Sequence, residues 1–361
     1  MTDTFTPGLL HRLPKMPRKV AVLRASRIGD FLCTIPALRA LRMGLPGAEI
    51  TLITLPLLRD LVSRCPYLDR FIAFPGFPGI AEQFFDARQA TQFFQRMHSE
   101  GFDLALQMQG SGIHSNPFML LLGARVTAGF VRYGDLAGRL DAALPFPQRG
   151  HEIQRMLALT TFLGAPPRGE ETEFPLWPEE HAIAEMLLMH VKRPLIGLHT
   201  SARDATRRWP LDRFVAVGKE LLQRYGGTAV ILGEPEDRSD GDVLAQEVEG
   251  PCLNLAGKTS LVELGAVITR LSVLVTNDTG PAHIAYALGI PTVTIFGAAS
   301  PKRYGPPERR LHQVLLYEVP CRPCGYTTCP IGYRCLAGVT VQQAVEAASA
   351  VMQYGFRKAE A

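Results

Sequence analysis

The segment VLVTNDTGPAHIAYALGIPTVTIFG, residues 273–297, places a polar turn between two apolar stretches. Asp278 and Thr279 stand directly before a predicted helix that begins with Gly280 and a proline. Free N–H groups at such a helix start, together with the Thr279 hydroxyl, form a seat for an anion. Gly280 lets the backbone approach a ligand closely, and His283 lies about one turn further along the helix. The turn therefore predicts a cradle for a diphosphate.

A second polar segment, LHTSARDATRRWPLDRF at 198–214, combines hydroxyls with arginines just before another predicted helix. Helix starts and Arg side chains suit phosphate oxygens, so Thr200, Ser201 and Arg207 are candidate contacts. The alternative is a solvated loop in which Trp209 packs as a plug. The chain lacks the Gly-x-x-x-x-Gly-Lys signature of a P-loop and the Gly-x-Gly-x-x-Gly fingerprint of dinucleotide-binding proteins.

Two further strand ends carry carboxylates. Gly29 and Asp30 follow the first predicted strand and open the first predicted helix, while Glu234 and Glu236 follow a strand that ends at Gly233. Asp30 fits an N-cap, or a general base that takes a proton from a sugar hydroxyl. A carboxylate at 234 or 236 can accept both hydroxyls of a ribose, although acidic residues are common at helix starts.

Four cysteines crowd together near the C-terminus with the spacing C-x₂-C-x₄-C-x₅-C: Cys321, Cys324, Cys329 and Cys335. Such spacing can fold around Zn²⁺ or iron, and a cytosolic setting favours thiolates over disulfides. The alternative is a thiol-rich turn without a metal. The pattern leaves both interpretations open.

Short apolar stretches and amphipathic stretches alternate along the chain. Predicted strands at 19–25 and 48–54 flank a predicted helix at 26–47. Strand, helix and strand within about 35 residues form a βαβ unit, which implies a parallel sheet. The alternation recurs up to residue 164 and starts afresh at residue 193. These elements predict an α/β fold whose polar segments follow the carboxyl ends of strands, where open parallel sheets bind ligands.

Residues 165–180 carry four prolines and five glutamates without a period, a composition typical of linkers. We therefore predict two tandem α/β domains joined by a proline-rich hinge. The expected ranges are 1–175 for the N-terminal domain, 176–339 for the C-terminal domain, and 340–361 for a final helix that packs back on the N-terminal domain.

The composition is that of an ordinary globular protein: 361 residues, 47% hydrophobic, 20% charged, with a formal net charge of +4. The mild basic excess fits a plain surface, or attraction to anionic substrates or a phosphate-rich membrane surface. Nucleic acid is not an expected partner, because no basic run is interleaved with aromatics. The N-terminus does not read as a secretory signal and no apolar run is long enough to span a bilayer, so we predict a cytoplasmic protein.

Several of these segments resemble the ADP-heptose:lipopolysaccharide heptosyltransferases of glycosyltransferase family 9. The resemblance is carried by residues 20–54, by RRWPLDRF at 207–214 and by 274–306; HEIQRML at 151–157 and the cysteine segment at 321–336 are also similar. It implies a GT-B architecture, in which two Rossmann-like doubly wound domains face each other across a cleft. It also implies inverting, metal-independent transfer of a heptose from an ADP-sugar to a lipopolysaccharide core acceptor.

The resemblance also implies roles for individual residues. Asp30 resembles the general base on an acceptor-binding N-terminal domain. The donor-binding residues carried over to the C-terminal, nucleotide-sugar-binding domain are Thr200, Ser201, Arg207, Glu236, Asp278, Thr279, Gly280 and His283. The family commonly has Lys where this chain has Arg207, which keeps the charge but changes the geometry and leaves the exact donor open. An anionic acceptor suits arginines at strand ends, although each also fits a solvated surface: Arg24, Arg27, Arg125 and Arg132.

No Asp-x-Asp-like pair stands in a donor-site context, so Mg²⁺ clamping is not indicated and no cofactor is expected. A related subgroup that glycosylates autotransporter proteins carries a metal-binding cysteine finger, but the spacing here is tighter. The alternatives are a family member that uses another nucleotide-sugar, or a protein or exopolysaccharide acceptor, and a silent nucleotide-binding scaffold. Asp30, Asp278, Thr279 and His283 together argue against the scaffold. Any membrane contact would be peripheral, at the inner face of the cytoplasmic membrane.

Overall fold

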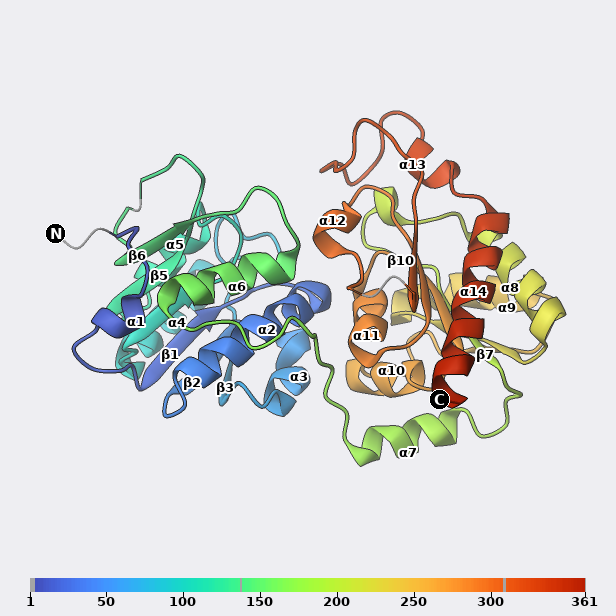
Figure 1. Ribbon diagram of the computed structural model, residues 1–361, viewed down its shortest axis with the longest axis horizontal. Coiled ribbons are helices and arrows are strands. Elements are labelled where there is room, and N and C mark those ends of the chain that lie inside the picture. Colours follow the sequence, from blue (N-terminus) through green and yellow to red (C-terminus); the bar gives the residue numbers. More distant parts are fainter. Residues whose placement is uncertain (1–3, 137, 308–309, 361) are drawn as a thin grey trace. The chain divides into compact units, whose positions relative to one another are not determined.

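The computed structural model describes residues 4–136, 138–307 and 310–360, with the side chains of 356–360 outside the description. The chain divides into two compact units, Met1–Pro175 and Leu176–Ala361. Each unit contains one six-stranded sheet in which every strand pair is parallel (Figure 1). The prediction of an α/β fold with parallel sheets is confirmed.

In unit 1 the strand order is β3-β2-β1-β4-β5-β6. The strands are β1 (Lys19–Leu23), β2 (Glu49–Thr54), β3 (Arg70–Ala73), β4 (Leu104–Gln107), β5 (Val126–Val131) and β6 (Ala142–Pro145). The helices are α1 (Leu9–Arg12), α2 (Ile28–Gly44), α3 (Arg59–Arg64), α4 (Ala87–Glu100), α5 (Ser115–Leu120) and α6 (Glu152–Leu163), with a 3₁₀ turn η1 (Pro56–Leu58). Central strand β1 is apolar on both faces because both faces are covered, and α2 packs against α6.

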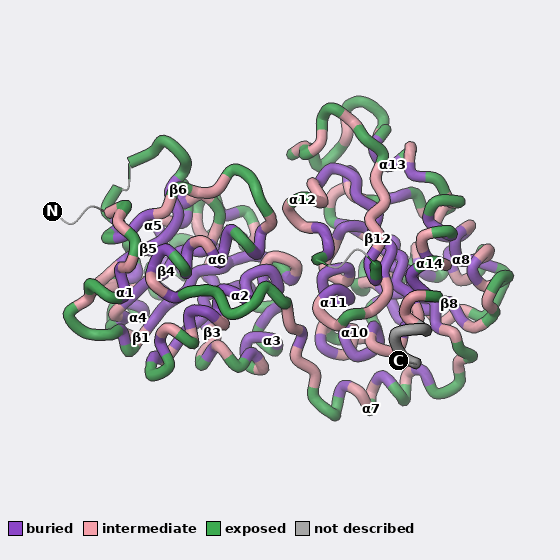
Figure 2. The backbone as a smooth tube through the Cα atoms, in the orientation of Figure 1, coloured by how far each residue is buried: buried purple, intermediate pink, exposed green. Residues whose placement is uncertain are grey.

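In unit 2 the strand order is β12-β11-β10-β7-β8-β9. The strands are β7 (Leu195–His199), β8 (Thr228–Leu232), β9 (Cys252–Asn254), β10 (Val273–Asn277), β11 (Thr292–Ile295) and β12 (His312–Leu315). The helices are α7 (Pro178–Leu187), α8 (Leu211–Tyr225), α9 (Arg238–Glu247), α10 (Leu261–Ile268), α11 (Gly280–Leu288), α12 (Pro301–Tyr304), α13 (Arg334–Ala337) and α14 (Val341–Glu360), with 3₁₀ turns η2 (Ala205–Arg207) and η3 (Pro235–Asp237). In both units the central strands are buried, as Figure 2 shows.

Helix α14 packs within unit 2. It lies against α8 and strands β10, β11 and β12. Ala344, Val345, Ala348 and Val351 are fully buried in the core that also holds Trp209. This differs from the expectation that the final helix packs back on the N-terminal domain. The apolar stripe of α14 has the spacing of a single buried helix face, and the sheet of its own unit supplies the partner.

Each sheet reverses its winding direction once. In unit 1 the reversal lies between β1 and β4, and in unit 2 it lies between β7 and β10. At such a switch point the loops beyond the carboxyl ends of the two strands diverge, which leaves room for a ligand. The candidate site residues are therefore best judged by their distance from these two points.

Candidate functional site

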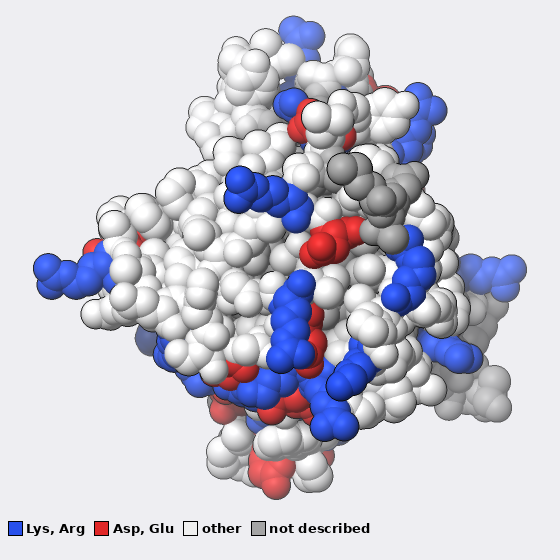
Figure 3. All heavy atoms as spheres, turned by 90° about the vertical axis from the view of Figure 1, so that its left-hand side faces the viewer, with Lys and Arg blue, Asp and Glu red and all other residues white. Residues whose placement is uncertain are grey.

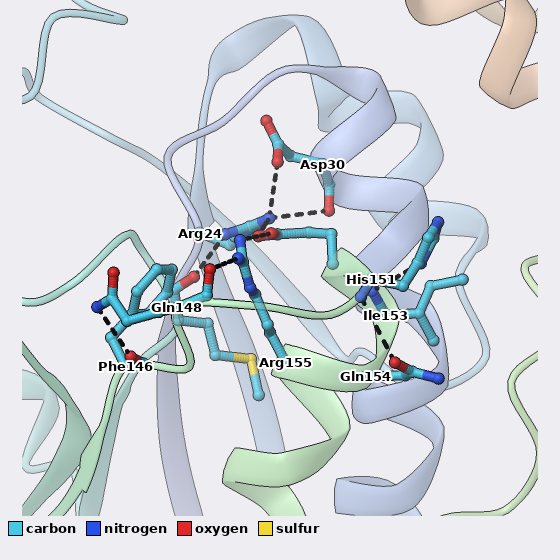
Figure 4. A network of polar contacts seen from close by, with 10 residues as sticks. Arg24, Asp30, Phe146, Gln148, His151, Ile153, Gln154 and Arg155 are labelled. Atoms are coloured by element: carbon cyan, nitrogen blue, oxygen red, sulfur yellow. Dashed lines mark hydrogen bonds and ion pairs between the residues drawn. The ribbon is translucent and has the colours of Figure 1, made fainter. Parts of the chain in front are cut away.

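Arg24 follows β1 at the switch point of unit 1. Its side chain is only 3% exposed, and its Nη1 donates to the carbonyl of Met108, just beyond β4, at 2.6 Å. Its Nη2 donates to Asp30 Oδ1 at 3.0 Å, as Figure 4 shows, and it also donates to Glu152 Oε1 at 3.0 Å. One guanidinium thus joins the ends of two neighbouring strands to carboxylates on α2 and α6. The sequence placed Arg24 among acceptor-binding arginines, whereas in the structure it is a buried partner of two acids.

Glu152, at the start of α6, balances the buried charge. Its side chain is 1% exposed and its Oε2 accepts from Arg155 Nη1 at 3.3 Å. Arg155 Nη2 in turn donates to the carbonyl of Gln148 at 3.1 Å. Buried charges are tolerated when they are paired and hydrogen-bonded, and here two arginines meet two carboxylates. The network fixes where Arg24, and therefore Asp30, can lie.

Asp30 is the member of this network that solvent reaches. It lies in the first turn of α2, whose N-cap is Arg27, so Asp30 is not the N-cap. Its side chain is 32% exposed, against 3% for Arg24 and 1% for Glu152. A carboxylate that is oriented by a buried cation and still open to solvent can accept a proton from a bound hydroxyl.

In unit 2, the ends of β7 and β10 are joined through side chains. Asn277 Nδ2 donates to the carbonyl of Thr200 at 2.8 Å, and Asn277 Oδ1 accepts from the backbone N–H of Trp209 at 3.0 Å. His199, the last residue of β7, contacts Thr276 Oγ1 at 3.1 Å and Ser201 Oγ at 3.2 Å. The segment after β7 is therefore held against the turn before α11.

Asp278 in that turn is a buried carboxylate that lies near Arg207 and His283. Its side chain is 3% exposed; Oδ2 lies 3.5 Å from Arg207 Nη1, and Oδ1 lies 4.0 Å from His283 Nε2. Arg207 remains 37% exposed. Asp278 is thus placed to aim Arg207 and His283, while the guanidinium is left accessible to an anion.

Helix α11 begins at Gly280 with a proline in its first two positions, and Thr279 is its N-cap. The Thr279 hydroxyl donates to the carbonyl of Asn277 at 3.3 Å and makes no capping bond to the helix. The first-turn N–H groups therefore have no side-chain cap from Thr279. Such a helix start attracts negative charge. The predicted strand, turn and helix are all present at the predicted residues.

Trp209 packs as a plug and also anchors its loop. It is fully buried, lies edge-on to Phe214 at 5.1 Å between ring centroids, and its Nε1 donates to the carbonyl of Val339 at 3.2 Å. The expected packing of Trp209 is therefore present, and Thr200, Ser201 and Arg207 lie at the carboxyl edge of the sheet.

A family model described as Glycosyltransferase family 9 (heptosyltransferase) matches residues 90–333, more than half of the chain. The chain belongs to glycosyltransferase family 9. Lipopolysaccharide heptosyltransferase 2 of Salmonella typhimurium is 28% identical over 300 residues, covering 78% of this chain and 84% of that protein. The family assignment makes the chain a glycosyltransferase.

Solved structures agree with the fold. A family 9 glycosyl transferase from Veillonella parvula has a TM-score of 0.78 at 20% identity, covering 93% of this chain and 98% of that one. The E. coli ADP-heptose lps heptosyltransferase II has a TM-score of 0.73 at 22% identity, covering 95% and 100%. The predicted GT-B fold class is confirmed by these matches.

The other residues predicted for this family 9 chain are spread more widely. Glu236 lies in η3 after β8 and is exposed. Arg27 is the N-cap of α2, and its Nε lies 3.2 Å from Glu82 Oε2. Arg132 follows β5 at the carboxyl edge. Arg125 stands before β5, at the opposite edge of the sheet from Asp30, and pairs with Asp103 there.

Arg125 therefore does not join the site. The sequence shows that an arginine flanks a strand, but the end of the strand at which it stands decides whether it reaches the ligand edge. The structure brings Asp30 and Arg24 together in unit 1, and it brings the 200–207 and 278–283 segments together in unit 2.

The four-cysteine segment is tied to the loop after β7. Thr206 Oγ1 donates to the carbonyl of Tyr326 at 2.7 Å, and Arg322 Nε donates to the carbonyl of Gly297 at 2.8 Å. Cys335 is buried in the unit 2 core, and Cys321 is exposed. Among the described residues no group of three or more Cys, His, Asp or Glu side chains gathers as a metal site would require.

The structure thus does not fit the predicted structural zinc or iron at Cys321, Cys324, Cys329 and Cys335. The segment instead contacts the Arg207 loop through the carbonyls of Tyr326 and Thr327, and Arg322 ties it to the loop after β11. Burial raises the pKa of the Cys335 thiol.

On the face in Figure 3, Lys and Arg side chains lie among Asp and Glu side chains over a mostly uncharged surface. Over the part of the chain that the structure describes, no helix has the length and apolar character needed to cross a bilayer.

His199 predicts a pH dependence of stability. Desolvation by burial lowers its pKa to about 4, and the charge of Asp237 opposes this shift only in part. The unfolded chain, with a His pKa of about 6.5, binds the proton more tightly. His199 therefore contributes fully to stability above about pH 6.5, and we expect up to roughly 3 kcal/mol to be lost between about pH 6.5 and pH 4.

Urea unfolding of the wild type and of His199→Asn across this pH range tests the expectation. The difference in unfolding free energy between the two should change most between pH 4 and pH 6.5 and level off above. A difference that is flat across the range would contradict a buried neutral imidazole.

Proposed function

We propose that the protein is an inverting, metal-independent heptosyltransferase that uses ADP-heptose and a lipopolysaccharide core acceptor. The observation that carries the proposal is the pair of switch-point sites: a solvent-accessible, guanidinium-held carboxylate in unit 1, and a helix start with an accessible arginine in unit 2. The names of its relatives, lipopolysaccharide heptosyltransferase 2 and ADP-heptose lps heptosyltransferase II, support the substrates.

In this proposal Asp30 is the general base. Its carboxylate takes the proton of an acceptor hydroxyl as that oxygen attacks the anomeric carbon of the donor. Arg24 donates a hydrogen bond to Asp30 Oδ1, which fixes the orientation of the carboxylate and of its second oxygen. The new glycosidic bond forms on the face opposite the departing diphosphate, which inverts the anomeric centre.

The donor site would stabilise the leaving diphosphate. The first-turn N–H groups of α11 and the Arg207 guanidinium supply positive potential where charge develops as the bond to the diphosphate breaks. Asp278 keeps Arg207 in place and His283 lies beside it. Arginine at this position can supply charge and a two-pronged hydrogen bond without a metal ion.

The donor nucleotide is tested by thermal unfolding of the purified protein with ADP, UDP, GDP or CDP in EDTA. ADP should raise the midpoint selectively, because a ligand that binds only the folded state stabilises it by about 2.7 kcal/mol at a hundredfold excess over Kd. A selective shift with another nucleotide would move the donor to another nucleotide-sugar. No shift with any nucleotide would contradict the proposed donor site.

A further inference from the structure

His199 lies at the centre of a hydroxyl cluster at the unit 2 switch point. It is 5% exposed, and three hydroxyls surround its ring. Nδ1 lies 3.1 Å from Thr276 Oγ1 and 3.4 Å from Thr279 Oγ1, and Nε2 lies 3.2 Å from Ser201 Oγ. Two of these hydroxyls, on Ser201 and Thr279, belong to the proposed donor site, yet His199 itself has no part in the proposed chemistry.

The protons of the cluster can be assigned by counting donors. Thr276 Oγ1 donates to the carbonyl of Asn277 at 3.0 Å, and Thr279 Oγ1 donates to the same carbonyl at 3.3 Å. Both threonine oxygens are then left to accept, which requires a hydrogen on Nδ1. A neutral imidazole carries only one N–H, so Nε2 offers a lone pair and accepts the proton of Ser201.

We infer that His199 is a positioning residue. Its Nε2 accepts the hydrogen bond of the Ser201 hydroxyl, so the Ser201 oxygen can only accept a hydrogen bond from the nucleotide-sugar. An acceptor oxygen cannot bond a phosphate oxygen, which carries no proton at neutral pH. Its partner on a nucleotide-sugar is a hydrogen-bond donor: a hydroxyl of the ribose or of the transferred sugar, or the amino group of adenine. This inference rests on the proposed function and revises the role of Ser201 from a phosphate contact to a contact with a donor group of the ligand.

The tautomer is tested on the protein without ligand. Nitrogen-15 NMR of the His199 ring at pH 7 should show a protonated Nδ1 and an unprotonated Nε2. A proton on Nε2 would overturn the inference whatever the protein binds, because Ser201 would then be free to donate.

The role of Ser201 is tested by the affinities for ADP and for ADP-heptose, measured by calorimetry on the full chain. Ser201→Ala and His199→Asn should each weaken binding about five- to tenfold, the effect of one lost hydrogen bond. The double variant should bind no more weakly than Ser201→Ala, because His199 acts through Ser201. His199→Gln, whose amide oxygen can reach the Nε2 position, should recover part of the affinity.

The two ligands distinguish the source of the donor group. A loss seen with both ADP and ADP-heptose points to the adenosine part, whereas a loss seen with ADP-heptose alone points to a hydroxyl of the transferred sugar. Fully additive losses in the double variant would overturn the inference while leaving the donor intact. A wild type that binds neither ligand would instead overturn the proposed donor, and the Ser201 contact with it.

Discussion

Asp30→Asn is expected to lower the rate of glycosyl transfer by about 10²- to 10⁴-fold, the usual contribution of a general base. Asparagine keeps the size of the side chain but cannot take a proton from the acceptor hydroxyl. Binding of ADP should survive, because the residues assigned to the donor belong to unit 2. The measurements are the rate of ADP release at saturating donor and acceptor, and the Kd for ADP.

Asp60→Asn is the matched control. Asp60 is also an acidic residue in the first turn of a helix in unit 1, α3, but it is exposed and has no role in the proposed mechanism. Its substitution should leave the transfer rate within about twofold, since surface changes away from special features have small effects. An Asp30→Asn variant with wild-type turnover would show that another group removes the proton.

Glu152→Gln is expected to destabilise the protein by about 3 kcal/mol, the lower end of the range for breaking a buried ion pair. Arg24 and Arg155 would stay buried with the carboxylate of Asp30 as the remaining acid of the network. The amide oxygen of glutamine still accepts one hydrogen bond, which limits the loss. The measurement is the urea midpoint followed by far-ultraviolet circular dichroism.

Two variants sharpen this test. Glu171→Gln removes an 80% exposed acid that pairs with Arg39, and it should leave the midpoint almost unchanged. Adding Arg155→Met to Glu152→Gln removes one of the uncompensated charges, so the double variant should be less destabilised than the sum of the single changes. Additive losses would mean that the four groups are not energetically coupled.

The unit 2 turn could be predicted from the sequence because local signals agree. An apolar strand, a polar turn and a helix with proline near its start follow one another within residues 273–288, so neighbouring residues alone define the geometry. The alternation of strands and helices likewise predicted parallel sheets. The edge strands β3 and β9 have only four and three residues, and helix α4 is amphipathic but polar on balance, so none of the three is among the predicted elements.

The contacts that define the site at atomic detail depend on distant residues. Arg24 and Glu152 are 128 residues apart, and His199 and Thr276 are 77 apart. Nothing in the sequence around Arg24 distinguishes a buried arginine from an exposed one, and Glu152 reads as an ordinary acid at a helix start. His199 could have been singled out only as a polar residue that ends an otherwise apolar strand.

The placement of α14 and of the cysteines was hard to predict for a related reason. An amphipathic helix at the end of a chain specifies that one face is buried, but not which sheet buries it. Cysteine spacing specifies a short loop, while the direction of each side chain depends on packing, and here Cys335 enters the core while Cys321 faces solvent.

The most direct test of the central claim is transfer itself. ADP release from ADP-heptose should be measured with a heptose-deficient lipopolysaccharide acceptor and EDTA, and the product linkage should be determined. The account predicts acceptor-dependent ADP release that EDTA does not abolish, with the anomeric configuration inverted in the product. Retention of configuration, or turnover that stops when metal is chelated, would contradict a mechanism based on Asp30 and the metal-free phosphate site.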